Sequence, residues 1–214
     1  MTEAAQVSPY QRLVEKAFSD AIPLTAQFEL TFRCNHLCTF CYNSPDGRRE
    51  LTTPQIFDAL AKIAEFGVLY LTLTGGEALC HKDFFKIAAE GRRLGMALRI
   101  YTNGYLIGDP AMAKKIADLK PFEVEISIHG AKAETHEALT RIKGSFAKTI
   151  QGVRNLRGLG IKVQLKCPIT KLNQNELYGI RDLADELGCF ITFDAVITPK
   201  DDGNLEPLAL RHDH

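Results

Sequence analysis

The sequence predicts an α/β fold built on a parallel sheet. Segments rich in β-branched and aromatic residues alternate with amphipathic segments of helical length through six β/α steps. No hairpin turn pattern separates two of the strand-like segments, so each connection is predicted to be a right-handed crossover. The 214 residues are 45% hydrophobic and 24% charged, which is typical of one folded domain with a sizeable core.

Six strands are predicted at regular spacing along the chain. Each is a short run with many β-branched or aromatic residues, and three of the six are followed by a Gly, Asn or Pro. Six units suit either an open doubly wound sheet or an incomplete barrel, and periodicity by itself leaves both open. The predicted strands are Ala26–Phe32, Val68–Thr74, Ala97–Thr102, Glu123–Ile128, Ile161–Cys167 and Cys189–Val196.

Helices are predicted between these strands from apolar stripes at helical spacing and from start signals. Thr53 and Asp109 each precede a proline, which is the pattern of an N-cap followed by the first helical position. Glycines at the ends of several stripes indicate helix C-termini. The expected helices start at Thr53, Asp83, Asp109, Ala133, Ser145 and Asn173.

The two ends of the chain differ from the repeating middle. Residues 1–25 are predicted to form a lead-in that contains a short amphipathic helix at Pro9–Phe18. Residues 26–199 form the predicted core domain. Residues 200–214 are expected to be a polar C-terminal tail with no packed element.

Charge and hydropathy exclude several functional classes. The chain has 26 Lys and Arg against 26 Asp and Glu, so it lacks the basic excess of a nucleic-acid-binding domain. No apolar run approaches the roughly 18 residues of a membrane span, and Met1–Ser8 lacks the apolar centre of a signal peptide. We therefore expect a cytoplasmic protein with no nucleic-acid or membrane partner.

The strongest local signal is a cysteine cluster directly after the first predicted strand. Cys34, Cys38 and Cys41 have the spacing C-x3-C-x2-C. Three thiolates on one loop can each bind one iron of a [4Fe–4S] cube and leave the fourth iron open to another ligand. A structural zinc site, with His36 or a distant residue as fourth ligand, is the alternative. Cys167 and Cys189 are expected to pack in the core. Cys80 follows Glu77 closely and either approaches the site or, as is more common for a lone cysteine, packs in the core.

Unusual polar residues follow the next three predicted strands. The runs are Gly75-Gly76-Glu77, Thr102-Asn103-Gly104, and Ser127 with His129. The carboxyl ends of parallel strands lie at one edge of a sheet, so these residues and the cysteines are predicted to share one site.

The cysteine spacing, with the aromatic Phe40 inside it, resembles the radical S-adenosylmethionine (SAM) superfamily. The three runs above and the segment Thr135-His136…Arg141 match that family in the same order, and the resemblance extends from Phe28 to Val196. It implies a partial (β/α)6 barrel of TIM type with its site at the C-terminal ends of the strands. It also implies a [4Fe–4S] cluster on the three cysteines and bound SAM.

The resemblance assigns SAM contacts to individual residues. It implies that Gly75, Gly76 and Glu77 bind the methionyl amine, that Ser127 faces the ribose, and that Arg141 pairs with the carboxylate. Phe40 and Asn103 are further implied SAM contacts. The alternatives are a plain glycine turn, a strand-end serine, an exposed helix arginine and an asparagine that only holds its loop. His129 and Asp194 are strand-end polar groups that are expected either to face the substrate or, as is commoner for a histidine, to pack in the core, and Lys166 near the end of the fifth predicted strand has no assigned role.

The implied reaction is reductive cleavage of SAM to a 5′-deoxyadenosyl radical, which abstracts hydrogen from the substrate. An electron donor such as a flavodoxin or ferredoxin is implied as a partner. Tyr42-Asn43, Ser127–Gly130 and the segment from Ile197 resemble SPASM-type enzymes, which often modify peptides or proteins, although this chain lacks their C-terminal cysteine-rich region. A radical SAM enzyme of cofactor biosynthesis with a small-molecule substrate, and an iron–sulfur or zinc module without turnover, remain alternatives.

Overall fold

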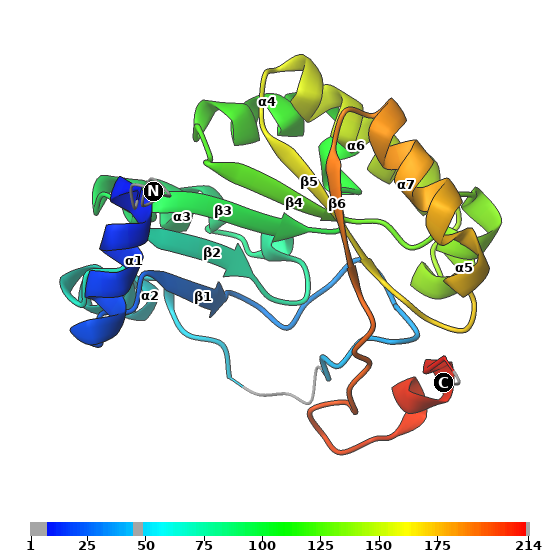
Figure 1. Ribbon diagram of the computed structural model, residues 1–214, viewed down its shortest axis with the longest axis horizontal. Helices are drawn as coiled ribbons and strands as arrows, with labels where there is room; N and C mark the ends of the chain where they lie inside the picture. The colour runs from blue at the N-terminus through cyan, green and yellow to red at the C-terminus, as the bar shows by residue number, and fades with distance from the viewer. Residues whose placement is uncertain (1–7, 45–48, 213–214) are drawn as a thin grey trace, which may run out of the picture.

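A single curved sheet of six strands organises the protein (Figure 1). The computed structural model describes residues 8–44 and 49–212. The strands pair in chain order, and each neighbouring pair is parallel, which confirms the α/β fold with six parallel strands. They are β1 (Thr25–Glu29), β2 (Tyr70–Thr74), β3 (Ala97–Thr102), β4 (Glu123–Ser127), β5 (Val163–Pro168) and β6 (Phe190–Asp194).

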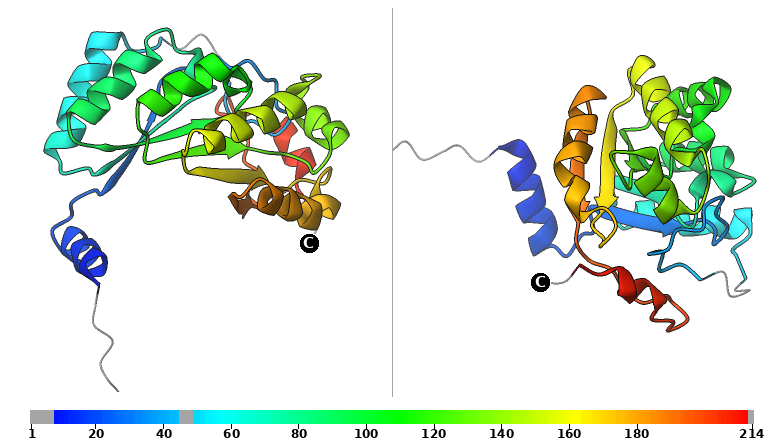
Figure 2. Two further views of the ribbon diagram at one scale, coloured as in Figure 1. Left: turned by 90° about the horizontal axis from the view of Figure 1, so that it is seen from above. Right: turned by 90° about the vertical axis from the view of Figure 1, so that its right-hand side faces the viewer.

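Helices cover the convex face of this sheet and leave the concave face open (Figure 2). Side chains alternate between the faces, as on β3, where Leu98 and Ile100 are fully buried among apolar residues. Arg99 and Tyr101 lie on the opposite, concave face and are partly exposed. The helices are α2 (Thr53–Glu65), α3 (Phe84–Arg93), α4 (Pro110–Asp118), α5 (Ala133–Thr140), α6 (Ser145–Gly158) and α7 (Leu177–Glu186).

Several helix starts differ by one residue from the sequence-based expectation. Thr52, not Thr53, is the N-cap of α2, because its hydroxyl and Gln55 form a capping box. Gly144 takes the N-cap position of α6, so Ser145 is the first helical residue. The last helix is preceded by a 3-10 turn, since the Asn173 side chain bonds to neighbouring loops instead of capping a helix.

The first strand is shorter than predicted. β1 ends at Glu29, and the chain then leaves the sheet after one more ladder contact, in which the Leu30 N–H donates to the Thr74 carbonyl at 2.9 Å. This early departure carries Thr31–Arg33 beside the loop after β2, where the cysteine segment begins.

The two ends of the chain lie on different parts of the molecule. Helix α1 (Pro9–Ser19) forms as predicted and stands away from the sheet (Figure 2). The described part of the C-terminal tail is mostly exposed, but it contains one short element that the sequence did not predict. A short 3-10 helix, η4 (Glu206–Leu210), buries Pro207, and the Asp201 N–H donates to the Tyr42 carbonyl at 2.9 Å.

No helix in residues 8–44 or 49–212 is long and apolar enough to cross a membrane.

Candidate functional site

A cavity of about 810 Å³ lies at the carboxyl ends of the strands. Its wall combines the cysteine loop with the segments that follow β2, β3 and β4, which confirms that these distant runs share one place. The predicted site residues that line it are Cys34, Cys38, Phe40, Cys41, Gly75, Gly76, Asn103, Ser127 and Arg141. Glu77 is the predicted site residue that does not.

The three clustered cysteines are free thiols on a loop that is held against the end of α5. The Leu37 N–H donates to the Thr140 carbonyl at 3.0 Å, and the Thr39 N–H donates to the Leu139 carbonyl at 2.9 Å. Burial raises the pKa of Cys34 to about 11. The pKa values of Cys38 and Cys41 are raised for the same reason, so the metal-free thiols are protonated at neutral pH and must lose protons to bind metal.

This donor set fits an iron–sulfur cluster. Thiolates that surround a cube bind separate irons, whereas a structural zinc needs four ligands around one ion. In the part of the chain that the structure describes, no three His, Cys, Asp or Glu side chains are placed to hold a single metal ion. His36, the fourth ligand in the zinc alternative, also lines the cavity and packs edge-on against Tyr105, with ring centroids 5.6 Å apart, and neither of its ring nitrogens has a hydrogen-bond partner among the described residues. Burial lowers the pKa of His36 to about 4.

The glycine pair after β2 contacts the backbone that leads into the cysteine loop. The Gly76 N–H donates to the Thr31 carbonyl at 2.7 Å. A Cβ on Gly75 would lie 2.4 Å from the Thr31 carbonyl oxygen, and one on Gly76 would lie 2.6 Å from that of Arg33. Gly75 also has a φ of 138°, which side chains rarely allow. The pair is therefore glycine because two loops touch here, in addition to lining the cavity.

The Glu77 side chain lies behind the cavity wall and does not face the cavity. It is 1% exposed. Its carboxylate accepts hydrogen bonds from the Asn103 N–H at 2.7 Å, the Thr102 hydroxyl at 2.8 Å and the Leu79 N–H at 3.1 Å. Burial raises the pKa of Glu77, while these hydrogen bonds favour the ionised form. In the structure Glu77 thus joins the loop after β2 to the loop after β3.

Asn103 links the same loop to the cysteine segment. Its side-chain amide donates to the Asn35 side-chain oxygen at 2.6 Å, and its carbonyl accepts from the Thr149 hydroxyl at 2.9 Å. Arg141 ends α5 in the left-handed conformation with a φ of 58°, an uncommon geometry for a residue with a side chain. Its exposed side chain lines the cavity.

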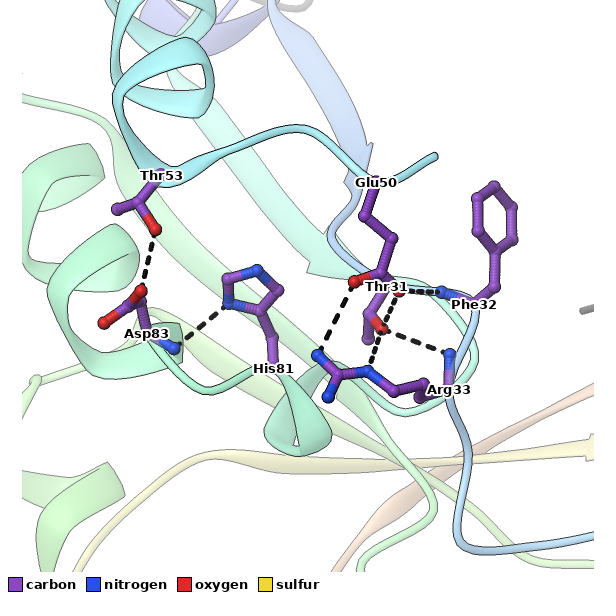
Figure 3. Close-up of polar contacts among 7 residues, drawn as sticks. All are labelled: Thr31, Phe32, Arg33, Glu50, Thr53, His81 and Asp83. Carbon is purple, nitrogen blue, oxygen red and sulfur yellow. Dashed lines mark hydrogen bonds and ion pairs between the residues drawn. The ribbon is translucent and has the colours of Figure 1, made fainter. Parts of the chain in front are cut away.

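A polar network that includes two residues of the cavity wall, Phe32 and Arg33, fixes the start of the cysteine loop (Figure 3). The Glu50 carboxylate accepts from the Thr31 hydroxyl and from the Phe32 N–H, and it lies 3.5 Å from the Arg33 guanidinium. Beside it, the His81 ring accepts from the Asp83 N–H at 3.2 Å. No motif in the sequence points to Glu50, because its partners are 17 to 19 residues away and meet it only in the fold.

The remaining polar candidates lie in different places. The Lys166 ammonium contacts the Glu125 carboxylate at 2.8 Å and donates to the Tyr101 hydroxyl at 2.9 Å on the concave face. Asp194 is the last residue of β6, and its carboxylate accepts a hydrogen bond from the Val196 N–H. His129 lines the cavity although it is only 3% exposed.

The isolated cysteines divide into two groups. Cys167 and Cys189 are buried in the core, as predicted. Cys80 is only partly buried, so the expectation that it packs in the core is wrong. It is the last residue of the 3-10 turn Ala78–Cys80 that follows Glu77.

Sequence reasoning missed several residues that line the cavity. Tyr101 is on β3, two residues before Asn103. Because side chains alternate along a strand, it could have been predicted to face the same side as Asn103. No sequence pattern points to Glu206, which reaches the cavity from the C-terminal segment together with Lys200. The missed residues include Gln27, Arg33, Tyr101 and Glu206.

Comparisons with known proteins match most of the chain to one family. The profile of the Radical SAM superfamily matches residues 28–184. An AdoMet-dependent heme synthase of Methanosarcina barkeri is 33% identical over 171 residues, which are 78% of this chain and 48% of that enzyme. A mycofactocin maturase, MftC, of Mycolicibacterium smegmatis is 32% identical over 187 residues, 85% of this chain and 47% of that protein.

Solved structures show the same fold. Streptococcus suis SuiB bound to its precursor peptide SuiA superimposes with a TM-score of 0.70 at 19% identity, over 90% of this chain and 46% of SuiB. The chain thus spans about half the length of the relatives that it matches.

Proposed function

Because the chain belongs to the radical SAM superfamily, we propose that it forms the SAM-cleaving core of an enzyme that modifies a peptide or protein. The observation that carries this proposal is the single cavity that brings the cysteine loop together with the loops after β2, β3 and β4. Membership of the family implies a [4Fe–4S] cluster and SAM. When bound, these two supply reductive cleavage of SAM to a 5′-deoxyadenosyl radical that abstracts hydrogen from the substrate.

In this proposal the cysteine loop holds the cluster. Cys34, Cys38 and Cys41 provide three thiolates, and α5 fixes their loop through two backbone hydrogen bonds. Because the thiols are protonated without metal, cluster assembly releases their protons to solvent. The network around Glu50 and Thr31 keeps the start of the loop in place while the cluster is inserted.

The residues around the rest of the cavity bind SAM. Gly75 and Gly76 present backbone groups without side chains in the way. The Arg141 guanidinium pairs with the SAM carboxylate, for which its planar donor pattern is suited. Ser127 faces the ribose, and Phe40 and Asn103 complete the contacts. Glu77 acts as a positioning residue, since its carboxylate holds the Asn103 backbone from behind.

The substrate is assigned from the relatives and from the open concave face. SuiB was solved with a precursor peptide, and a peptide needs an extended, accessible surface such as the concave face between β1 and β6. The heme synthase supports a second candidate, modification of a small molecule in cofactor biosynthesis. In both cases a flavodoxin or ferredoxin supplies the electron.

The decisive experiment is anaerobic reconstitution followed by an assay of 5′-deoxyadenosine. The chain is loaded with iron and sulfide, reduced with dithionite and incubated with SAM. We expect one cluster per chain and steady release of 5′-deoxyadenosine. A fully loaded protein that releases none is an iron–sulfur module without turnover. Adding candidate peptides or a haem precursor then separates the two substrate classes, since the true substrate raises 5′-deoxyadenosine release and gains a modification detectable by mass spectrometry.

A further inference from the structure

Residues 197–211, which follow β6, form a loop whose two ends are fastened together. The Arg211 guanidinium donates two hydrogen bonds to the Ile197 carbonyl, from Nε at 3.0 Å and from Nη2 at 2.8 Å. Ile197 and Pro207 are buried, which anchors the loop at its start and at η4. A compact surface loop with joined ends holds its side chains in defined places, and such loops are frequently functional.

This C-terminal loop is docked on the residues that directly follow Cys41. The two segments run side by side in Figure 1, where the Asp201 N–H donates to the Tyr42 carbonyl at 2.9 Å. The Ser44 hydroxyl donates to the Asp202 carboxylate, also at 2.9 Å. Because both hydrogen bonds reach residues next to Cys41, they fix the position of the C-terminal loop relative to a proposed cluster ligand.

The docking places an ion pair in the wall of the cavity. Lys200 directly precedes Asp201, and its ammonium lies 3.2 Å from the Glu206 carboxylate. Both members of the pair line the cavity. The Lys200 side chain is 27% exposed and that of Glu206 is 59% exposed, so solvent screens the ammonium less than it screens the carboxylate.

The charges of the C-terminal loop act on Cys41. Burial is the largest of the effects that raise the pKa of the Cys41 thiol. Among the charged side chains, Asp201 and Glu29 raise that pKa further, and Lys200 lowers it. A neighbour that favours the thiolate over the thiol stabilises negative charge at this place. Lys200 therefore supplies positive charge beside one of the three clustered cysteines.

We propose that Lys200 raises the reduction potential of the cluster held by Cys34, Cys38 and Cys41. The inference rests on the proposed function, which places the cluster on these cysteines. Uptake of one electron adds a negative charge to the cluster, and a neighbouring ammonium stabilises this reduced form by Coulomb attraction. The cluster is then easier to reduce by its electron donor.

The test measures the midpoint potential of the reconstituted cluster without SAM, in an anaerobic titration followed by electron paramagnetic resonance. Lys200→Met should lower the potential by the equivalent of about three- to tenfold in the reduction equilibrium, where tenfold corresponds to about 59 mV for one electron. Glu206→Gln should raise the potential, because the ammonium loses the carboxylate that offsets its charge. Lys200→Arg keeps the charge and should stay within about twofold of wild type.

The opposite signs of these shifts separate charge from structure. Lys200→Met and Glu206→Gln break the same ion pair, so a loosened loop would move both potentials in one direction. Lys16→Met on α1, which stands away from the sheet, is the control and should leave the potential unchanged.

Two results would overturn the role of Lys200 in a protein with full iron and sulfide content. One is an equal potential in wild type and Lys200→Met, and the other is a shift of the same sign in Lys200→Met and Glu206→Gln. A wild-type chain that takes up no iron and sulfide would instead overturn the proposed function.

Discussion

The Glu77 carboxylate accepts a 2.7 Å hydrogen bond from the backbone N–H of Asn103, 26 residues further along the chain. With a second bond to the Thr102 hydroxyl, it couples the glycine loop after β2 to the start of the loop after β3. Both loops line the cavity, so this buried contact sets the separation of two parts of its wall.

Glu77→Ala should therefore lower both stability and SAM affinity. Removing the carboxylate leaves the Asn103 N–H and the Thr102 hydroxyl buried without their acceptor, which costs about 2–3 kcal/mol in the free energy of unfolding. We expect SAM binding to weaken roughly tenfold because Asn103 moves. Urea unfolding and SAM titration measure the two effects. Glu90→Ala, at a partly exposed ion pair on α3, is the control that should change neither. Wild-type stability in Glu77→Ala would show that the contact is unimportant.

Single Ala substitutions of Cys34, Cys38 and Cys41 should each abolish the brown chromophore while the sheet stays folded. Each removes one of the three thiolates on which the cluster depends. Cys189→Ala, in the core and away from the cavity, should keep full iron and sulfide content. Iron analysis and circular dichroism give the two measurements. The assignment fails if a single variant retains its cluster, or if the native protein contains one zinc ion.

Gly76→Ala should impair cluster loading. The added Cβ would lie 2.6 Å from backbone oxygens of Phe32 and Arg33, so the start of the cysteine loop must shift. Gly158→Ala is a suitable control, because a Cβ there meets no atom within 4 Å. We expect lower iron content and a lower melting temperature in the first variant only. A Gly76→Ala variant with the iron content of the wild type would show that the contact between the glycine loop and the cysteine loop is not needed for cluster binding.

Arg141→Met should weaken SAM binding about ten- to a hundredfold at unchanged iron content. The loss corresponds to one charge-assisted hydrogen-bonded pair, worth about 1.5–3 kcal/mol. Lys143→Met removes a nearby exposed charge and serves as the control. Equal SAM affinity in both variants would identify Arg141 as an ordinary surface arginine.

Stability should fall as the pH drops below about 6.5. Burial lowers the pKa of His136 to about 3, so between these values the unfolded chain binds a proton that the folded chain does not. The stability that comes from keeping His136 neutral is fully present above pH 6.5. It is lost towards pH 3, where the free energy of unfolding falls by about 1.4 kcal/mol per pH unit. We expect His136→Phe to flatten the pH dependence of the free energy of unfolding, measured with urea on the metal-free chain. An unchanged slope between pH 7.5 and 5 would contradict this assignment.

Local patterns in the sequence determined the fold class and the cysteine site. Strand alternation and helix start signals report interactions between residues that are close along the chain, so six parallel strands could be predicted from them. The spacing of Cys34, Cys38 and Cys41 is also local, and the loops that follow parallel strands necessarily meet at one edge. For this reason the cavity contains most of the residues that the sequence singled out.

Only the tertiary structure decided what individual side chains do. From its residue type and position, Glu77 is predicted to contact a ligand. Its carboxylate instead accepts hydrogen bonds from the Thr102 hydroxyl and the Asn103 N–H at the end of β3. Glu50 and the C-terminal segment meet the cysteine loop through contacts between distant residues, which no local pattern encodes. His129 lies on a face that alternation predicts, but the position of its ring depends on contacts with Phe40, His136 and Asn173. Burial and hydrogen-bond partners are properties of the folded chain, because they are set by residues that the sequence does not place side by side.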